Sequence, residues 1–410
     1  MQRLFDQARI RNIAARAARR LPIHRLLFQG TAIGLYGAVR LARRAGPPRG
    51  RHTPRHVVHV TPAYFSDLSY IGGGERYVTA LAEAMAERVE TRLISFGPTR
   101  ASFRKGHLKV EVYPVRRWLA GGFMAPISYR FLRELMSADV VHGHQYRSTV
   151  ANLAILAGAA LGKRVFVSEY GGVGYNLTQR LPIADFVDCF LSISAFSAKM
   201  LPVFKHTRVV YGGVDKRFLQ PHDQIQERKR TIVFVGRLLP HKGINYLIEA
   251  IDQDMHLEVI GRAYDPEYLA LLQQLAQGKQ VRFITDASDE AVIQAYRNAV
   301  VTVLPSVYTD VYGTHYDVPE LLGLVMLESM ACGTPVICTN VGAMPEYVED
   351  GVTGFVAPPN DPVALRERLA YILANPAVAR QLGQTARQRV QQEFTWEAVA
   401  LRCLAAYHDV

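Results

Sequence analysis

Beyond residue 56, apolar residues follow two alternating patterns: short continuous runs typical of buried strands, and longer segments with apolar positions at helical spacing. The first series predicts strands at Val57–Val60, Arg92–Phe96, Val110–Val115, Val140–Val141, Val165–Val167 and Cys189–Ile193, and helices at Arg76–Arg88, 126–137 and 148–161. The second series predicts strands at Thr231–Val235, Leu257–Ile260, Val281–Phe283, Val301–Leu304 and Pro335–Cys338, and helices at Asn245–Ile251, 266–277, 289–299 and Glu320–Ala331. Strands that alternate with helices form parallel sheets with helices on both faces. We therefore predict an α/β protein with two doubly wound domains.

The two series divide the chain into four segments. A linker rich in Pro and Gly ends a basic N-terminal extension (1–55), and the polar stretch Gln220–Arg230 begins the second series. We predict domains at 56–219 and 220–390, followed by a C-terminal helical segment (391–410) that packs back toward the first domain. Because ligands of doubly wound sheets bind beyond the carboxyl ends of the strands, the predicted site is a central cleft between two facing domains.

The net charge of the chain is confined to the N-terminal extension. The protein has 48 Lys and Arg against 36 Asp and Glu, a formal net charge of +12. Residues 1–55 contain thirteen Arg, no Lys and one acid, Asp6, which accounts for the whole surplus. The rest of the chain is neutral, and this argues against nucleic-acid binding through the body of the protein.

Two apolar patterns lie within this extension. The first is an imperfect basic amphipathic helix with apolar positions at Ile10, Ile13, Ala14, Ala17 and Leu21. The second is the run of fourteen uncharged residues Leu26–Val39, shorter than the about 20 residues that span a bilayer core. We predict that residues 1–44 lie in a membrane interface, with apolar groups among acyl chains and Arg at anionic headgroups. The alternatives are a solvated tail and a transit peptide, although the extension lacks the Ser that transit peptides favour.

Cysteine usage and the absence of an export signal indicate the compartment. The four Cys residues are far apart and show no metal-ligand spacing: Cys189, Cys332, Cys338 and Cys403. This spacing argues against a disulfide framework and a structural zinc site. No signal-peptide cleavage pattern follows the apolar run. We expect a cytoplasmic protein without a bound metal.

A candidate anion site follows the first strand of the second domain. The run Gly236–Gly243 reads Gly-Arg-Leu-Leu-Pro-His-Lys-Gly and leads into the next helix. Arg237 offers a forked pair of donors and Lys242 a mobile point charge, beside a helix N-terminus that already favours anions. The two cations suit a diphosphate, although a pair of this kind in a βα loop is also commonly only solvated.

Two carboxylates eight residues apart form a second candidate. Glu320 follows Pro319 and is predicted to open the helix Glu320–Ala331. Glu328 then lies two turns further on, about 12 Å along the axis and roughly 80° around it. One carboxylate would reach the sugar end of an extended ligand, and the other its ribose hydroxyls. A capping or ion-pairing role for Glu328 is the alternative.

Together these motifs resemble the nucleotide-sugar-dependent, retaining glycosyltransferases of family 4, which have the GT-B fold of two Rossmann-like domains. The resemblance lies in the Gly-Arg-x4-Lys-Gly loop, the Glu-x7-Glu pattern and the run Ala-Cys-Gly-Thr-Pro-Val at 331–336. It extends, more weakly, from Val57 to the C-terminus. The resemblance implies that the catalytic residues are Arg237, Lys242, Glu320 and His144, and that the donor is bound by Gly73, Gly74, Gly236, Arg237, Lys242, Glu320, Leu324 and Glu328.

Further matches lie in the first domain. Gly72–Glu75 resembles the family's Gly-rich loop, whose backbone approaches the donor or the acceptor, and Asp139–His144 resembles its Asp-Val-Val-His-x-His strand end. A lone His at such a place is also commonly structural. Where the family often has a His near the transferred sugar, this chain has Tyr170. Glu75 and Tyr170 are therefore candidate contacts to the sugar or the acceptor.

Three features need separate interpretation. The family's Asn before Gly-Val-Asp is Gly212 here, and the segment Val307–Pro319 is inserted where the family passes from Pro-Ser to its first Glu within a few residues. We hypothesise that this insertion is a lid or specificity loop over the donor sugar; an interaction loop away from the cleft is the alternative. The acidic triplet Asp252–Asp254 has the Asp-x-Asp form of a metal site, but its position between a helix and a strand indicates a turn.

The resemblance implies transfer of a sugar from a UDP- or GDP-sugar to a lipid-linked or saccharide acceptor, with retained configuration and without a cofactor or metal. With the basic extension, it indicates synthesis of a glycolipid, capsule or cell-surface polysaccharide at the cytoplasmic face of a membrane. The alternatives are a non-catalytic sugar-nucleotide-binding protein, a phosphorylase-like enzyme, and a nucleic-acid binder acting through the Arg-rich arm.

Overall fold

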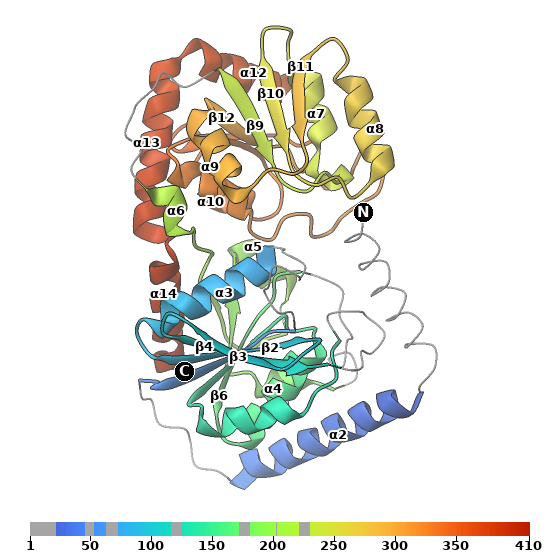
Figure 1. The fold of residues 1–410 in the computed structure, drawn as a ribbon, viewed down its shortest axis with the longest axis vertical. Helices are drawn as coiled ribbons and strands as arrows, with labels where there is room; N and C mark the ends of the chain where they lie inside the picture. Colours follow the sequence, from blue (N-terminus) through green and yellow to red (C-terminus); the bar gives the residue numbers. More distant parts are fainter. Residues whose placement is uncertain are drawn as a thin grey trace. The chain divides into compact units, whose positions relative to one another are not determined.

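The computed structural model describes residues 22–45, 53–62, 73–115, 125–171, 181–201, 203–220 and 230–410. Contacts divide the chain into two compact units, each with its own sheet (Figure 1). The first unit comprises residues up to 193 with 198–210 and 399–410, and the second comprises 194–197 and 211–398. The main division therefore lies between Val210 and Tyr211 rather than at the predicted 219/220.

The first unit contains an eight-stranded sheet in the order β3-β4-β2-β1-β5-β6-β7-β8. Its strands are β1 (His56–Val60), β2 (Glu90–Gly97), β3 (Ala101–Lys105), β4 (Leu108–Pro114), β5 (Val140–His144), β6 (Arg164–Ser168), β7 (Cys189–Ser192) and β8 (Thr207–Val209). Only β3 pairs antiparallel, with β4. The edge strands β3 and β8 were not predicted. Both are largely exposed, and neither has an apolar run. The other strands match the predicted parallel sheet.

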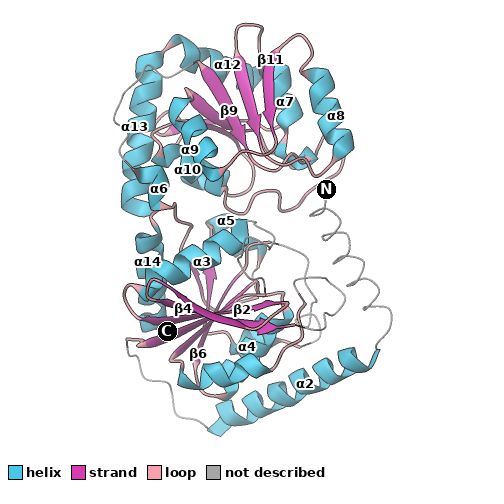
Figure 2. Ribbon diagram, viewed as in Figure 1, coloured by secondary structure: helices cyan, strands magenta, loops and turns pink. Residues whose placement is uncertain are grey.

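Helices cover both faces of this sheet (Figure 2). The helices of this unit are α2 (Pro22–Ala45), α3 (Gly73–Ala86), α4 (Thr149–Ala160) and most of α14 (Trp396–Asp409), with 3-10 turns at Arg130–Ser137 and Ile183–Phe186. Helix α5 (Ala195–Met200) is divided between the two units. The helix predicted at 126–137 is thus a shorter 3-10 helix. Helix α4 is buried along almost its whole length because α2 packs over it.

Helix α2 changes the interpretation of the N-terminal extension. Phe28, Ala32 and Val39 are completely buried in the core of the first unit, and the Tyr36 ring lies 5.2 Å from that of Phe186. These apolar groups pack on the domain. They are therefore not available to acyl chains, contrary to our prediction. The amphipathic segment predicted before Pro22 lies outside the described residues. None of the described helices is both long and apolar enough to cross a membrane.

The second unit contains a six-stranded, wholly parallel sheet in the order β11-β10-β9-β12-β13-β14. Its strands are β9 (Thr231–Val235), β10 (His256–Ile260), β11 (Gln280–Ile284), β12 (Val301–Leu304), β13 (Val336–Thr339) and β14 (Gly354–Ala357). This is the 3-2-1-4-5-6 order of dinucleotide-binding sheets. The chain leaves β9 toward β10 and later returns to β12 on its other side, so the order reverses between β9 and β12. In the first unit the same reversal lies between β1 and β5.

The helices of the second unit include one whose start differs from the prediction. They are α6 (Lys216–Leu219), α7 (Ile244–Ala250), α8 (Pro266–Leu275), α9 (Asp289–Asn298), α10 (Leu324–Ala331), α11 (Met344–Tyr347), α12 (Pro362–Ala374) and α13 (Pro376–Glu393), with a 3-10 turn η5 at Pro240–Lys242. Helix α10 begins at Leu324, not Glu320, because Gly323 before it has a φ of 82°, which a helix interior does not allow. The predicted spacing of Glu320 and Glu328 along one helix is therefore wrong.

Candidate functional site

In the second unit, Lys242 and Glu320 form an ion pair where the strand order reverses. Lys242 ends η5 after β9, and Glu320 precedes α10 in the segment that follows β12. The Lys242 Nζ donates to Glu320 Oε1, and the Ser306 hydroxyl donates to the same oxygen at 2.7 Å. Sequence reasoning assigned the two charges to different parts of a ligand and missed Ser306. The structure brings all three side chains together, although Lys242 and Glu320 are 78 residues apart along the chain.

The environment of this pair sets its charges. Burial alone would raise the pKa of Glu320, but Lys242, Ser306 and His241 together hold that pKa below its usual value. Burial and the Lys242 ammonium lower the pKa of His241 to about 4, so this imidazole is neutral near pH 7. The site therefore combines one carboxylate, one ammonium and one neutral imidazole, and its own charges balance.

Two glycines allow the backbone to close around the pair. Gly243 has a φ of 65°, and a Cβ there would lie 2.0 Å from the Pro305 carbonyl oxygen. Gly342 has a φ of 57°, and a Cβ there would lie 2.1 Å from the Glu320 carbonyl oxygen. That oxygen accepts the Ala343 N–H at 3.0 Å. Both positions require glycine because any side chain would collide with backbone.

Arg237 lies in the same loop, and its side chain is exposed to solvent. Its guanidinium is close enough to His241 to contribute to the lowered pKa of that ring. In the described part of the chain no carboxylate pairs with Arg237. Gly236 precedes it and donates its N–H to the Ile260 carbonyl, which fixes the end of β9 against β10. The exposed guanidinium is thus the group of this loop that is best placed to meet an anion.

Glu328 and Leu324 belong to α10. Glu328 is half-buried and accepts a hydrogen bond from the Tyr296 hydroxyl at 3.2 Å. Leu324 and Leu322 pack against Gly212, where an added Cβ would lie 2.9 Å from Leu322 Cδ2 and 3.3 Å from Leu324 Cδ2. A side chain at 212, where the family has Asn, would require Leu322 to move.

The insertion 307–319 folds around one buried carboxylate. Asp310 accepts the N–H groups of Tyr312 and Thr314, both at 2.9 Å, and the Tyr316 hydroxyl at 3.0 Å. The Tyr316 ring lies 4.9 Å from that of His241, which adjoins Lys242. The loop is therefore an ordered element beside the ion pair.

In the first unit, the candidate residues gather at the end of β5 and the start of α3. Gly73 and Gly74 open α3, Glu75 lies in its first turn, and Gly72 lies outside the described residues. A Cβ at Gly74 would lie 3.2 Å from the side-chain amide of Gln145 and 3.3 Å from Tyr170 Cβ. Glycine at 74 thus lets the partly exposed Tyr170 approach the N-terminus of α3.

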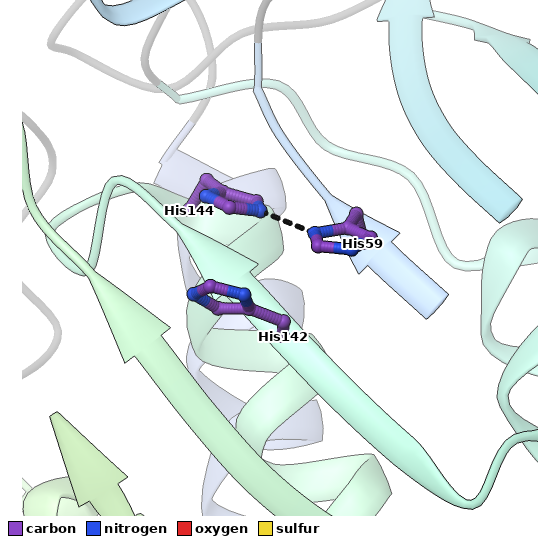
Figure 3. Close-up of side chains that lie close together, drawn as sticks. All are labelled: His59, His142 and His144. Atoms are coloured by element: carbon purple, nitrogen blue, oxygen red, sulfur yellow. Dashed lines mark hydrogen bonds between the residues drawn. The ribbon is translucent and has the colours of Figure 1, made fainter. Parts of the chain in front are cut away.

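His144, in contrast, is completely buried and belongs to a cluster of three imidazoles (Figure 3). Its partners are His59 on β1 and His142 on β5, and one ring nitrogen from each lies within 4.8 Å of the others. Both nitrogens of His144 are engaged, by Tyr170 Oη at 2.6 Å and by His59 Nδ1 at 2.8 Å. Sequence reasoning missed His59, because it lies inside an ordinary strand pattern.

The carboxylate of Glu169 is a second feature that the sequence did not reveal. It is 4% exposed and accepts the N–H groups of Arg147, Tyr170 and Gly171 at 3.0–3.2 Å. Burial raises its pKa, although the hydrogen bonds from these N–H groups oppose the shift. Glu169 thereby fixes the backbone that carries Tyr170.

The fold and the placement of these groups define a class. Two Rossmann-like sheets, each with candidate residues at its reversal of strand order, form the GT-B fold of glycosyltransferases. Solved structures agree: sucrose-phosphate synthase from Thermosynechococcus elongatus matches with a TM-score of 0.64 and 24% identity, covering 87% of this chain and 98% of that one. The Anabaena protein HepE, in complex with UDP and glucose, matches with a TM-score of 0.67 and 16% identity, covering 87% and 100%.

Sequence comparisons give the family. The profile described as Glycosyl transferases group 1 matches residues 215–389, and that described as Glycosyltransferase Family 4 matches 71–218. The alpha-maltose-1-phosphate synthase of Mycolicibacterium smegmatis is 34% identical over 353 residues, 80% of this chain and 81% of that one. The chain belongs to glycosyltransferase family 4. It also matches the D-inositol 3-phosphate glycosyltransferase of Corynebacterium glutamicum at 30% identity over 49% of this chain, which spans about half (51%) of that relative's length.

Proposed function

We propose that the protein transfers a glycosyl group from a nucleoside diphosphate sugar to an acceptor, with retained configuration. The observation that carries this proposal is the Lys242–Glu320 pair beside the exposed Arg237, at the reversal of strand order where such sheets bind ligands. The leaving diphosphate gains negative charge as the glycosidic bond breaks, and the two cations would stabilise it. Glu320 and Glu328 would bind the hydroxyls of the donor sugar and of the ribose.

A ligand screen followed by a transfer assay tests the proposal. Thermal shifts with UDP, GDP, ADP and their sugars identify the donor, because a ligand that binds the folded state raises its stability. Uridine is the favoured nucleoside of the donor, since the structural neighbour HepE was solved in complex with UDP. Proton NMR of the product then reports the anomeric configuration. Binding without transfer or donor hydrolysis would favour a non-catalytic binding protein, and an inverted product would refute retention.

The acceptor is proposed to carry phosphate. A groove of about 540 Å³ in the first unit is lined by Arg100, Arg130, Arg133, Tyr113 and Tyr129. Arg100 pairs with Glu111 and Arg133 with Glu134, while Arg130 is exposed. Two sequence relatives and one structural neighbour have names that pair a sugar or inositol with phosphate. A panel of free saccharides, sugar phosphates and lipid-linked diphosphates separates the candidates; exclusive use of free saccharides would contradict the proposal.

Membrane association remains a proposal in a narrower form. Because α2 buries Phe28, Ala32 and Val39, we propose that its exposed side chains Ile33 and Leu41, among those that the structure describes, meet the membrane together with the Arg-rich residues before Pro22. Flotation with anionic and neutral liposomes tests this, with a variant lacking residues 1–21 as control. Stronger binding of that segment to DNA than to anionic liposomes would favour a nucleic-acid role for the arm.

The insertion is proposed to select the donor sugar. Replacing Asp310 by Ala removes the acceptor of three hydrogen bonds, so the Tyr316 ring should lose its position against His241. We expect the ratio of kcat/KM for two donor sugars to change about fivefold, the scale of a modest loss of binding discrimination. Asp317→Ala, at a carboxylate 87% exposed, is the matched control. An unchanged donor profile in Asp310→Ala would place specificity elsewhere.

A further inference from the structure

A continuous chain of contacts links the core of the first unit to Tyr170. The Tyr170 hydroxyl contacts His144 Nδ1 at 2.6 Å, and His144 Nε2 contacts His59 Nδ1 at 2.8 Å. His59 Nε2 in turn contacts the sulfur of Met85 at 3.3 Å. Met85, His59 and His144 are completely buried, whereas Tyr170 is partly exposed. Figure 3 shows the central link, with His59 on β1 and His144 at the end of β5.

The direction of every hydrogen bond in this chain follows from its buried end. A thioether has no proton and can only accept, so His59 Nε2 carries the hydrogen. Burial lowers the pKa of His59 to about 3, so this ring is neutral and its Nδ1 is an acceptor. His144 must then donate from Nε2, which leaves its Nδ1 to accept the proton of Tyr170. Met85 thus determines that the Tyr170 hydroxyl donates inward.

The third imidazole obeys the same rule and argues against a metal at the cluster. The Ser168 hydroxyl donates to the Leu191 carbonyl at 2.7 Å, so it accepts from His142 Nε2 at 3.0 Å, and His142 Nδ1 accepts from Tyr407 at 2.7 Å. Its ring centroid lies 4.1 Å from that of His144, with 35° between the planes. The ring nitrogens of His142 and His144 are therefore all engaged in hydrogen bonds, which a metal ion would have to displace.

We propose that His59 and Met85 are positioning residues: they hold the Tyr170 proton inside the domain and thereby fix the Tyr170 ring beside Gly74. Gly74 opens α3 at the reversal of strand order, where sugar or acceptor hydroxyls are expected, so the Tyr170 ring would line the ligand site there. This inference rests on the proposed function for the identity of the ligand, but not for the direction of the hydrogen bonds from Met85 to Tyr170.

The first test measures the tautomers directly. In full-length protein labelled with ¹⁵N-histidine, two-dimensional NMR should show His59, His142 and His144 neutral and protonated at Nε2 from pH 6 to 8. Assignment uses the single variants His59→Asn and His142→Asn. Protonation of Nδ1 in His59 or His144, or displacement of either signal by added Zn²⁺, would overturn the proposal.

The second test separates positioning from a structural role. His59→Leu removes the acceptor for His144 and should raise KM for the nucleotide sugar identified by thermal shift about tenfold, the scale of one hydrogen bond. His59→Asn keeps an acceptor oxygen and should restore KM to within about threefold. In a Tyr170→Phe background, His59→Leu should cost nothing further. Equal losses in both backgrounds would overturn the proposal. Absence of any transfer by the wild-type protein would refute the proposed function. The histidine tautomers would still show in which direction the hydrogen bonds between Tyr170 and Met85 run.

Discussion

Replacing Lys242 by Ala should reduce kcat for glycosyl transfer by about 100-fold or more, comparable to removing one oxyanion donor from an enzyme. The ammonium is held by Glu320 in a site of balanced charge, so it is already in place when the leaving diphosphate develops its charge. Because this stabilisation grows in the transition state, kcat should fall more than KM rises. Steady-state kinetics with the donor identified by thermal shift provide the measurement.

The matched control for Lys242 is Lys216→Ala. Lys216 is in the same unit, its side chain is 76% exposed, and it pairs with Glu397 at the surface. Turnover of this variant should equal that of the wild type. Arg237→Ala should lose activity as Lys242→Ala does, since both cations face the same anion in the proposal. Near-normal turnover in both variants would remove the diphosphate assignment.

Replacing Glu320 by Gln should lower the free energy of unfolding of the second unit by about 3 kcal/mol at pH 7, because it leaves the ammonium of Lys242 buried without its counter-charge. The lowered pKa of Glu320 fixes the pH dependence. Its contribution is complete above the unfolded-state pKa of about 4.3 and is lost as pH falls through the lower folded-state value. The gap between wild type and variant should therefore be constant from pH 8 to 5 and narrow below about pH 4.

Urea unfolding at a series of pH values measures this gap. Glu258→Gln is the control, since Glu258 forms a surface pair with Arg282 at 3.7 Å and should change stability by less than about 1 kcal/mol. A gap for Glu320→Gln that closes near pH 6 would show that another group titrates. No gap at pH 7 would show that the ion pair does not stabilise the fold.

Local pattern predicted most of the scaffold. The strands on either side of each reversal, β1, β5, β9 and β12, were all located, because a short apolar run between turns has few other interpretations. The motif around Arg237 and Lys242 also fell at a strand end as expected. Periodicity could not place the start of α10, since the apolar pattern does not reveal that Gly323 has a left-handed conformation.

The side-chain pairs within the sites could not be predicted from the sequence, for a different reason. Lys242 meets Glu320 across 78 residues, and His59 meets His144 across 85. Each of these side chains follows an ordinary local pattern, and only the order of the strands brings them together. The apolar run in α2 is a similar case: its pattern indicated a face to be buried, but not that α4 rather than a membrane would bury it.

Helix α14 has a consequence for the order of events during synthesis. Val399, Cys403 and Tyr407 are completely buried in the first unit, where the Tyr407 ring lies 4.6 Å from that of Phe166. The ribosome makes these residues after the whole second unit. The first unit, although it begins earlier in the chain, can therefore not complete its core until residues beyond the second unit have been made. Until α14 docks, the apolar surface around Phe166 lacks the cover that Tyr407 gives it.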